Sequence, residues 1–567
     1  MEKQKEYDLK QMVSKQLKEL VDSKIDEYMV KYENEIEYLL YYPLIKLENK
    51  FKIVDWDLHE AIPDQRIISW FVKEILKRKN INTATKFHYD KNEYAHFEKL
   101  YEEICQWYWD NKYSEEVKDV RTIAKHTILE EKEFEYKLIR PSIVNSYSPE
   151  NMYYFGAHDL KRTKDLEILT EAIMDHLAAT YEPISIIPVT VGNKMYPFRK
   201  RKISSSQSKV NKLHINIDKT LLELCKNKVW FDLSILDNEI NSNIIKNTEE
   251  CINIVSFFYY LSSIRNFLNN IDFDLGELQE TSSICIYPKE WLISKMEREL
   301  GIKSSIIYKY IDYFLMKGET KGTLNEFPLF EVNGELIFAP STFLLNDWHL
   351  SIVNGHYHSK IEFTKRDDTI SSSVVNDIVE YVKKYENVIC RYEKNFHYYE
   401  EGDPKPKDGE IDVALYDTIN NHLLIIECKW KDNVYSPEEN YQQIERELNS
   451  IYNTQISNIK RYFELDRNNI NFIFDNNEKV LELYKDAKVS YIAVDKRVQL
   501  HNNDQHFVAL YMLLSLFEYK CLKGDNILDL NIFMDIIDNL RTESIYDDND
   551  PVKREIIVND IKFKLPY

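Results

Sequence analysis

The feature that most constrains this chain is the run from Gly409 to Trp430, where two apolar segments flank a short polar turn. β-Branched and apolar residues fill 411–416 and 423–428, and the turn between them is built from Asp, Thr, Ile and Asn. This pattern predicts an antiparallel hairpin. A four-residue loop over 418–421 makes Asp417 face His422 and fixes the pairing of the two strands.

The predicted pairing places three catalytic-type side chains together. Asp412 lies directly opposite Glu427, and opposite Cβ atoms on neighbouring strands are about 4.5–5.5 Å apart. Because side chains alternate along a strand, Glu410 and Asp412 are expected on the same face as Glu427 and Lys429. The other face is expected to hold the hairpin against a core through Ile411, Val413, Leu415, Leu424, Ile426 and Cys428.

Two adjacent carboxylates and one ammonium indicate a particular chemistry. The carboxylates repel each other unless a cation lies between them, and oxygen ligands suit a hard ion such as Mg²⁺ or Mn²⁺. Such an ion can polarise a phosphate oxygen, while a nearby lysine can orient the attacking water and offset the developing charge. The trio therefore predicts a hydrolytic phosphodiesterase site.

The segment from Gly409 to Lys429 resembles the core of the PD-(D/E)XK nuclease superfamily, which has the restriction-endonuclease-like fold. It is similar in particular to the Mrr-like and nuclease-related branches, whose versions lack the proline of the name; here Ile411 occupies that slot. The resemblance implies that Asp412 and Glu427 bind the metal and that Lys429 is the catalytic lysine. It also implies Mg²⁺ or Mn²⁺ as cofactor and a nucleic acid, DNA by family habit, as substrate.

The flanking sequence supplies the remaining elements of that fold in order. A helix is predicted over 371–386 and a first strand over 387–392, ahead of the hairpin. Ser436 and Pro437 start a second helix that continues to Phe463, and 489–494 reads as a fourth strand. The expected core is α-β-β-β-α-β, closed by a helix over 505–521.

Accessory residues of the site are less clearly marked. Glu380 projects opposite the apolar stripe of the first helix and Glu386 lies at its end, so neither is assigned to the site. Gln442 and Gln443 lie in the first turn of the second helix, where they are either accessory residues or simply solvated.

The complete chain is predicted to be an α+β multidomain protein. Residues 1–140 are expected to be mostly helical, 141–360 to form a mixed α/β sensing or targeting region, 365–525 the nuclease domain, and 526–567 a C-terminal tail. No apolar run approaches the ~20 residues that span a bilayer, and the N-terminus lacks the apolar centre of a signal peptide. Seven scattered cysteines without a Cys-x-x-Cys pair are expected to be reduced. A cytoplasmic protein that does not associate with membranes is therefore expected.

The net charge of −21 means that binding of a nucleic acid needs a local basic face. The clearest candidate is the run Arg199, Lys200, Arg201 and Lys202, although an exposed loop explains it equally well. The acidic balance suggests that a homo-oligomer or a partner protein directs or activates cleavage.

Three interpretations remain open from the sequence. The first is a metal-dependent nuclease, which by resemblance acts as a bacterial restriction or anti-phage effector. The second is a scaffold that keeps the nuclease fold but binds without cutting. The third is a surface hairpin that carries Asp, Glu and Lys only as a cross-strand ion pair.

Overall fold

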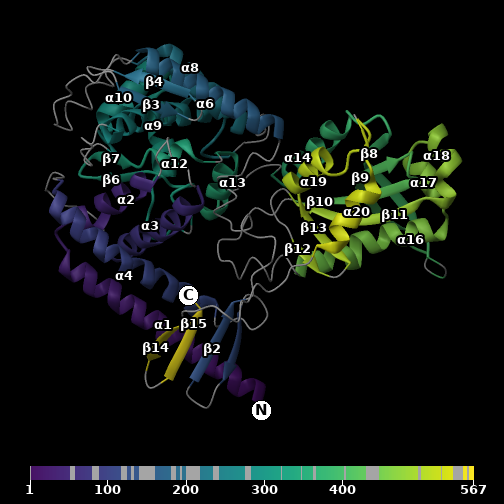
Figure 1. Cartoon of the computed structure of the whole chain (residues 1–567), viewed down its shortest axis with the longest axis horizontal. Coiled ribbons are helices and arrows are strands. Elements are labelled where there is room, and N and C mark those ends of the chain that lie inside the picture. The colour runs from purple at the N-terminus through teal and green to yellow at the C-terminus, as the bar shows by residue number, and fades with distance from the viewer. Residues whose placement is uncertain are drawn as a thin grey trace. The chain divides into compact units, whose positions relative to one another are not determined.

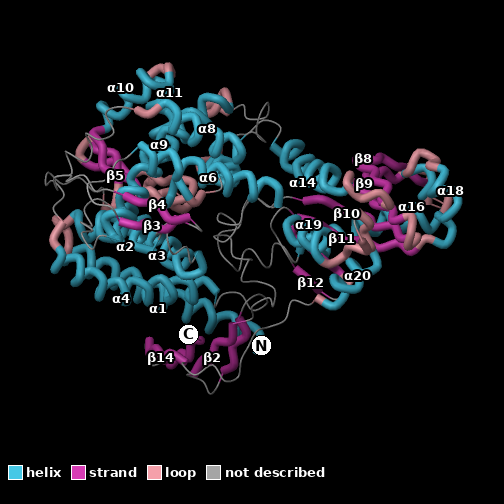
Figure 2. The backbone as a smooth tube through the Cα atoms, turned by 45° about the horizontal axis from the view of Figure 1, so that its top comes forward, coloured by secondary structure: helices cyan, strands magenta, loops and turns pink. Residues whose placement is uncertain are grey.

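A computed structural model shows the chain as two compact units (Figures 1 and 2). The first contains Met1–Lys118, Tyr153–Gly156 and Arg162–Thr364, and the second contains Asp119–Met152, Ala157–Lys161 and Lys365–Tyr567. No helix in the described part of the chain is long and apolar enough to cross a membrane. The structure describes residues 2–50, 58–79, 89–116, 124–128, 133–138, 160–180, 187–191, 194–198, 217–233, 242–274, 283–320, 322–346, 348–361, 366–400, 402, 404–429, 446–495, 500–502, 504–524, 526–540, 553–558 and 561–566.

Helices dominate the first unit. A π-helical turn, Glu37–Tyr41, joins its first two helices, and a hairpin across Asn333 and Gly334 has positive φ at both turn residues, as the Asn-Gly pair predicts. The helices are α1 (Glu2–Lys31), α2 (Tyr42–Lys50), α3 (Leu58–Arg78), α4 (Lys91–Glu116), α6 (Leu160–Thr180), α8 (Lys219–Leu233), α9 (Thr248–Asp274), α10 (Lys289–Leu300), α11 (Ser304–Phe314), α12 (Ser341–Leu344) and α13 (Trp348–His358). The strands are β3 (Ile187–Val191), β4 (Lys194–Phe198), β5 (Cys285–Pro288), β6 (Phe330–Val332) and β7 (Glu335–Phe338).

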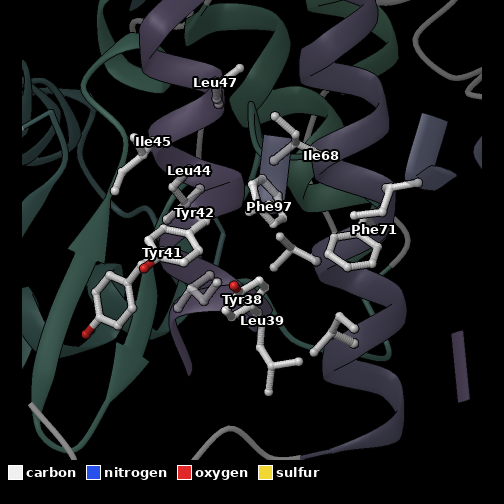
Figure 3. Packing of buried hydrophobic residues seen from close by; sticks show 14 of the residues in the cluster. Tyr38, Leu39, Tyr41, Tyr42, Leu44, Ile45, Leu47, Ile68, Phe71 and Phe97 are labelled. Carbon is white, nitrogen blue, oxygen red and sulfur yellow. The ribbon is translucent and has the colours of Figure 1, made fainter. Parts of the chain in front are cut away.

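An aromatic core holds the N-terminal helices together (Figure 3). Tyr38 and Tyr42 from the segment after α1 lie beside Phe97 of α4, and Phe71 of α3 packs from the other side. All four side chains are buried. The tyrosine-rich N-terminal sequence therefore serves packing in this unit.

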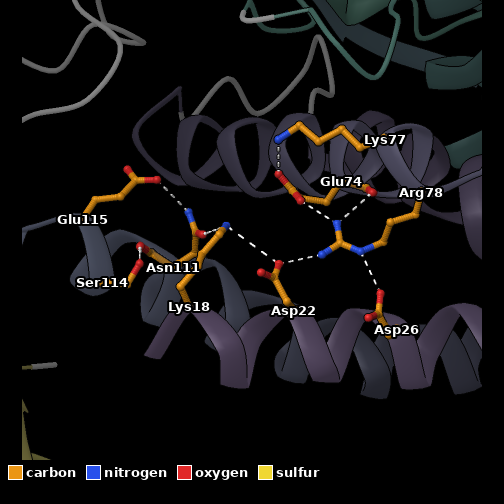
Figure 4. Close-up of polar contacts among 9 residues, drawn as sticks. All are labelled: Lys18, Asp22, Asp26, Glu74, Lys77, Arg78, Asn111, Ser114 and Glu115. Carbon is orange, nitrogen blue, oxygen red and sulfur yellow. Dashed lines mark hydrogen bonds and ion pairs between the residues drawn. The ribbon is translucent and has the colours of Figure 1, made fainter. Parts of the chain in front are cut away.

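A single arginine also joins two of these helices (Figure 4). The Arg78 guanidinium at the end of α3 donates to Asp22 at 2.6 Å and to Asp26 at 2.9 Å, both on α1. It also bonds Glu74, one turn earlier on α3, at 2.6 Å. Three carboxylates therefore share the donors of one guanidinium group at this contact.

A four-stranded sheet joins segments that are distant in sequence. Its order is β1 (Ala124–Ile128), β2 (Glu133–Leu138), β15 (Ile561–Pro566) and β14 (Lys553–Val558), with β2 and β15 parallel. The predicted divisions at 1–140 and 526–567 are therefore wrong, because both end segments contribute hairpins to one sheet. A lone hairpin is marginally stable and leaves both edges unpaired, and no local pattern reveals which edge it joins.

The second unit is built around a six-stranded mixed sheet with the order β12-β13-β11-β10-β9-β8. Strands β8, β9 and β10 run antiparallel in succession, and β11 then joins β10 in parallel. The strands are β8 (Val388–Tyr398), β9 (Lys407–Asp417), β10 (His422–Lys429), β11 (Lys488–Asp495), β12 (Leu500–Asn502) and β13 (Gln505–Ala509).

Helices pack against this sheet. A helical stretch over 446–451 continues through a π-helical turn (Tyr452–Ile456) into α16 (Ser457–Leu465), and the part before α16 packs on Ala493, Leu500 and Phe507. Together with α17 (Asn469–Ile473) and α18 (Glu478–Leu483), α16 supplies apolar side chains that pack on Ala414, Tyr416, Leu423 and Ile425. The strands β8, β9 and β10 also contact α14 (Arg366–Val382). The remaining helices are α19 (Leu510–Tyr519), which contacts α14, and α20 (Leu530–Asn539), which contacts β10.

The sequence misplaced two elements of this unit. The helix predicted over 505–521 begins only at Leu510, because 505–509 form a buried strand beside β11. The first strand does not end at Tyr392 but continues to Tyr398, since Phe396 and Tyr398 pack on Tyr462 of α16. In both places a tertiary partner decides the local structure.

Candidate active site

The hairpin forms in the predicted register. Asp417 pairs with His422, and pairing continues without a slip to Val413 and Ile426. The buried Asp417 carboxylate fixes the turn, accepting hydrogen bonds from the backbone N–H groups of Ile419 and Asn420 at 3.0 and 3.1 Å. Turn chemistry and strand alternation therefore suffice to set the register.

The sheet divides where the candidate residues lie. Hydrogen-bonded pairing between β9 and β10 ends at Val413 and Ile426, whereas β9 stays paired with β8 as far as Lys407. Strand β10 likewise stays paired with β11 as far as Lys429. We call this division the fork, with a β8–β9 arm and a β10–β11 arm. Asp412 on the β8–β9 arm and Glu427 on the β10–β11 arm each lie one residue beyond the last pair.

The three predicted side chains contact one another or the opposite arm. Asp412 Oδ2 accepts a 2.7 Å hydrogen bond from the backbone N–H of Cys428, so a carboxylate replaces the next rung of the ladder. Lys429 Nζ donates to Glu427 Oε1 at 2.7 Å. The charge of Asp412 also acts on Glu427 and raises the pKa of its carboxyl group.

Burial raises the pKa of both carboxyl groups of this trio. The Glu427 side chain is only 3% exposed, and burial, followed by the charge of Asp412, raises its pKa to about 7. Burial also raises the pKa of Asp412, although the Lys429 ammonium opposes that shift. Because the charge of Asp412 acts on Glu427, this pair of carboxyl groups holds a shared proton or needs a cation.

The lysine is stabilised in its charged form. Burial by itself lowers the pKa of Lys429, but the carboxylates of Glu427 and Asp412 more than offset this effect and raise the pKa. The side chain remains 25% exposed. A fixed ammonium group therefore stands at an accessible edge of the carboxylate pair.

The β8–β9 arm adds two carboxylates that the prediction did not assign to the site. Glu393, between the Tyr392–Val413 and Lys394–Ile411 pairs, has φ of +50°, which is uncommon for a residue with a side chain. Burial raises the pKa of Glu410, and the charges of Asp412 and Glu393 raise it further. Glu393 was not among the predicted site residues, because the first strand was predicted to end at Tyr392.

The regular alternation expected along β9 is broken at this level. Ile411 packs in one cluster with Ala414, Tyr416 and Phe396, although it was expected on the face of Val413. The positive φ of Glu393 marks the irregularity in the neighbouring strand. The apolar face predicted for the hairpin is therefore wrong for Ile411, and its strands are buried on both faces.

The other predicted residues fall into two groups. Glu380 and Glu386 are exposed, and Glu380 pairs with Lys383, which agrees with leaving both out of the site. Six others lie outside the described residues, namely Gln442 and Gln443 and the basic run Arg199–Lys202. The buried Asp495 pairs with Lys429 across β10 and β11. It was not among the predicted site residues, because it lies one residue beyond the predicted fourth strand.

The donor set suits a hard divalent cation. Glu427 Oε2 is buried and accepts no hydrogen bond, so one carboxylate oxygen beside Asp412 is left for another partner. In the described part of the chain, no group of three or more His, Cys, Asp or Glu side chains is arranged to hold a metal ion. Two protein carboxylates with further oxygens from water and substrate phosphate are a common way to hold Mg²⁺.

Comparisons with known proteins found no match to this chain among protein-family models, curated proteins or solved structures.

Proposed function

We propose that this protein is a metal-dependent nuclease that hydrolyses phosphodiester bonds, with DNA as the expected substrate. The observation that carries the proposal is the meeting of Asp412, Glu427 and Lys429 at the fork, with one buried oxygen of Glu427 left without a donor. A cross-strand ion pair alone does not require a buried carboxylate pair, whose mutual repulsion destabilises the site unless a cation or proton is present.

The element order supports the proposed PD-(D/E)XK fold. The sequence α14, β8, β9, β10, the helix over 446–465 and β11 follows the expected α-β-β-β-α-β order. The candidate acids lie on the second and third strands of that series, as the resemblance implies. At their level the backbone pairing of β9 with β10 has ended, and the Asp412 carboxylate bonds the Cys428 N–H instead.

The residues divide the chemistry among them. Asp412 and Glu427 would hold a Mg²⁺ or Mn²⁺ ion, which when bound supplies Lewis-acid activation of a phosphate oxygen. Lys429, charged and one quarter exposed, would orient a water for attack and stabilise negative charge on the phosphate oxygens. The Cys428 N–H holds Asp412 in place.

The test uses the purified full chain with Mg²⁺ or Mn²⁺ and a panel of linear, circular and single-stranded DNA and of RNA. We expect metal-dependent cutting by the wild type and its loss in Lys429→Ala. If neither protein cuts while the wild type binds Mn²⁺ and Asp412→Asn does not, the metal site is real and cleavage awaits an activator. Absence of both cutting and metal binding would reject the metal site and favour the non-cutting scaffold.

A further inference from the structure

The first unit contains a helix-turn-helix followed by a hairpin. Among the described elements, helix α9, strand β5, helices α10 and α11 and the hairpin β6–β7 follow one another along the chain. In the sheet, β7 lies between β5 and β6, and α9 contacts both α10 and α11. This is the arrangement of a winged helix-turn-helix. In DNA-binding motifs of this kind the second helix, which corresponds to α11, lies in the major groove.

The turn between α10 and α11 is short and held by hydrogen bonds. Gly301 follows α10 with φ of +68° and donates its N–H to the Glu297 carbonyl at 3.0 Å. The Glu297 carboxylate crosses the turn and accepts a 3.1 Å hydrogen bond from the N–H of Ser304, the first residue of α11. The turn therefore spans only 301–303, a length typical of helix-turn-helix motifs, which often place a glycine there.

Helix α11 has a buried face and an exposed face. The buried face holds the helix against the core of the unit through Ile307, Tyr310, Ile311 and Phe314. The opposite stripe is open to solvent and carries Ser305, Tyr308, Lys309 and Asp312. Figure 2 shows α10 and α11 at the edge of the first unit. The exposed stripe is therefore a surface that a large ligand can reach.

The turn and the exposed stripe are basic, although the chain has a net charge of −21. Lys303 in the turn and Lys309 in the stripe are both exposed. Asp312 is the acid of the stripe, and Lys317 bonds its carboxylate at 3.1 Å and offsets its charge. This surface therefore has the charge that complements a polyanion, and its lysine and serine side chains are types that contact phosphates and bases.

The neighbouring acids lie beside α11, on α10 and on the hairpin. Glu290 of α10 accepts a hydrogen bond from the Tyr308 hydroxyl. Glu331 of β6 pairs with Lys289 at 2.6 Å, and Glu335 begins β7. Because the hairpin carries these acids, it is not suited to contact phosphates. The turn before α11 and the exposed stripe of α11 are the part of the motif that suits DNA.

We propose that α11 is a recognition helix and that it binds double-stranded DNA in the major groove. Lys303 and Lys309 contact phosphates and position the helix, while Ser305 faces the base edges. The inference rests on the proposed function for the choice of DNA as the ligand. It needs none of the metal-site residues, because the surface belongs to the first unit.

The experiment measures binding without cleavage. The purified full chain is titrated in EDTA against labelled DNA duplexes of random sequence, each about 20 base pairs or two helical turns long, and fluorescence anisotropy is followed. Duplex RNA of the same length is the comparison, because side chains cannot read its deep and narrow major groove. The test variant is Lys303→Ala with Lys309→Ala. The control is Lys91→Ala with Lys99→Ala, which removes the same charge from exposed positions on α4.

We expect the wild type and the control to bind duplex DNA more tightly than duplex RNA. The test variant should bind duplex DNA about tenfold or more weakly, and the slope of log affinity against log salt concentration should fall by about two. Equal affinity for the two duplexes, or equal affinity of the test and control variants, would overturn the inference and leave this face to a protein partner. Binding in EDTA is independent of cutting, so failure here leaves the proposed nuclease to its own assay.

Discussion

Lys429 Nζ lies 2.7 Å from Glu427 Oε1, and the two residues stand two positions apart on the same strand. Glu427 therefore holds the Lys429 side chain next to the carboxylate pair where the lysine would act. The other oxygen of Glu427 remains without a donor, so the contact neutralises half of the carboxylate and leaves the other half for a cation.

Replacing Lys429 with Met should separate catalysis from metal binding. We expect cleavage to fall by about a hundredfold or more, because the variant lacks the ammonium that stabilises the transition state. Metal binding should persist but weaken at pH 7, since loss of the positive charge raises the pKa of Glu427 further. Cleavage assays and calorimetry at pH 7 and 8.5 measure both effects. Lys394→Met is the control, because that lysine bonds Asp475 on the surface; unchanged cleavage in Lys429→Met would contradict its assigned role.

The raised pKa of Glu427 predicts a distinctive pH dependence of stability. Its folded pKa of about 7 lies above the ordinary value of 4.5, so the folded state binds more protons than the unfolded state between these pH values. Without metal, the free energy of unfolding should therefore fall as pH rises from about 4.5 to 7, and this contribution should vanish in Glu427→Gln. Saturating Mg²⁺ should also oppose the fall, because the ion replaces the proton.

The buried Glu48 of α2 provides a comparison within the same chain. Burial raises its pKa to about 8, so Glu48 should also make the free energy of unfolding fall as pH rises from 4.5 to 8. It bonds Ser341 and takes no part in the fork, so Mg²⁺ should leave its contribution unchanged. Calorimetry from pH 5 to 8 with Glu427→Gln and Glu48→Gln resolves the two; a Mg²⁺ effect that survives Glu427→Gln would count against this assignment.

Gly409 is required by close packing across the β8–β9 arm. A Cβ atom there would lie 2.3 Å from Cζ of Phe396. The Phe396 ring cannot easily move away, because it stacks on Tyr462 with the ring centroids 4.6 Å apart. Gly409→Ala should destabilise the second unit by about 1–3 kcal/mol. Thermal unfolding of Gly409→Ala, Phe396→Leu and the double variant forms the measurement. If Phe396→Leu does not relieve part of the loss, the clash is not its cause.

Arg78 should contribute measurably to the packing of α1 on α3. Its guanidinium bonds Asp22, Asp26 and Glu74, and the Glu74 side chain is 5% exposed, so Arg78→Met leaves a buried carboxylate with fewer donors (Figure 4). We expect a loss of about 1–3 kcal/mol in the free energy of unfolding of the first unit. Arg298→Met is the control, since that arginine is well exposed and its guanidinium bonds the adjacent Glu299. Hydrogen exchange in α1 should accelerate in Arg78→Met alone.

The sequence by itself determined the hairpin and its register. Asp417 and the loop after it set where the turn falls, and the pairing then continues without a slip to Val413 and Ile426, one residue short of Asp412 and Glu427. Both effects are local, because they depend on turn hydrogen bonds and on neighbouring side chains.

Only the tertiary structure decided how these residues are used. The fork exists because β9 keeps β8 as its partner after it leaves β10, and the continuation of β8 depends on packing against α16. That packing brings Glu393 to the site, and burial of Glu427 by the surrounding elements raises its pKa. Pairing between distant strands and the loss of solvent around a carboxylate depend on contacts made only after folding, so no local pattern in the sequence could reveal them.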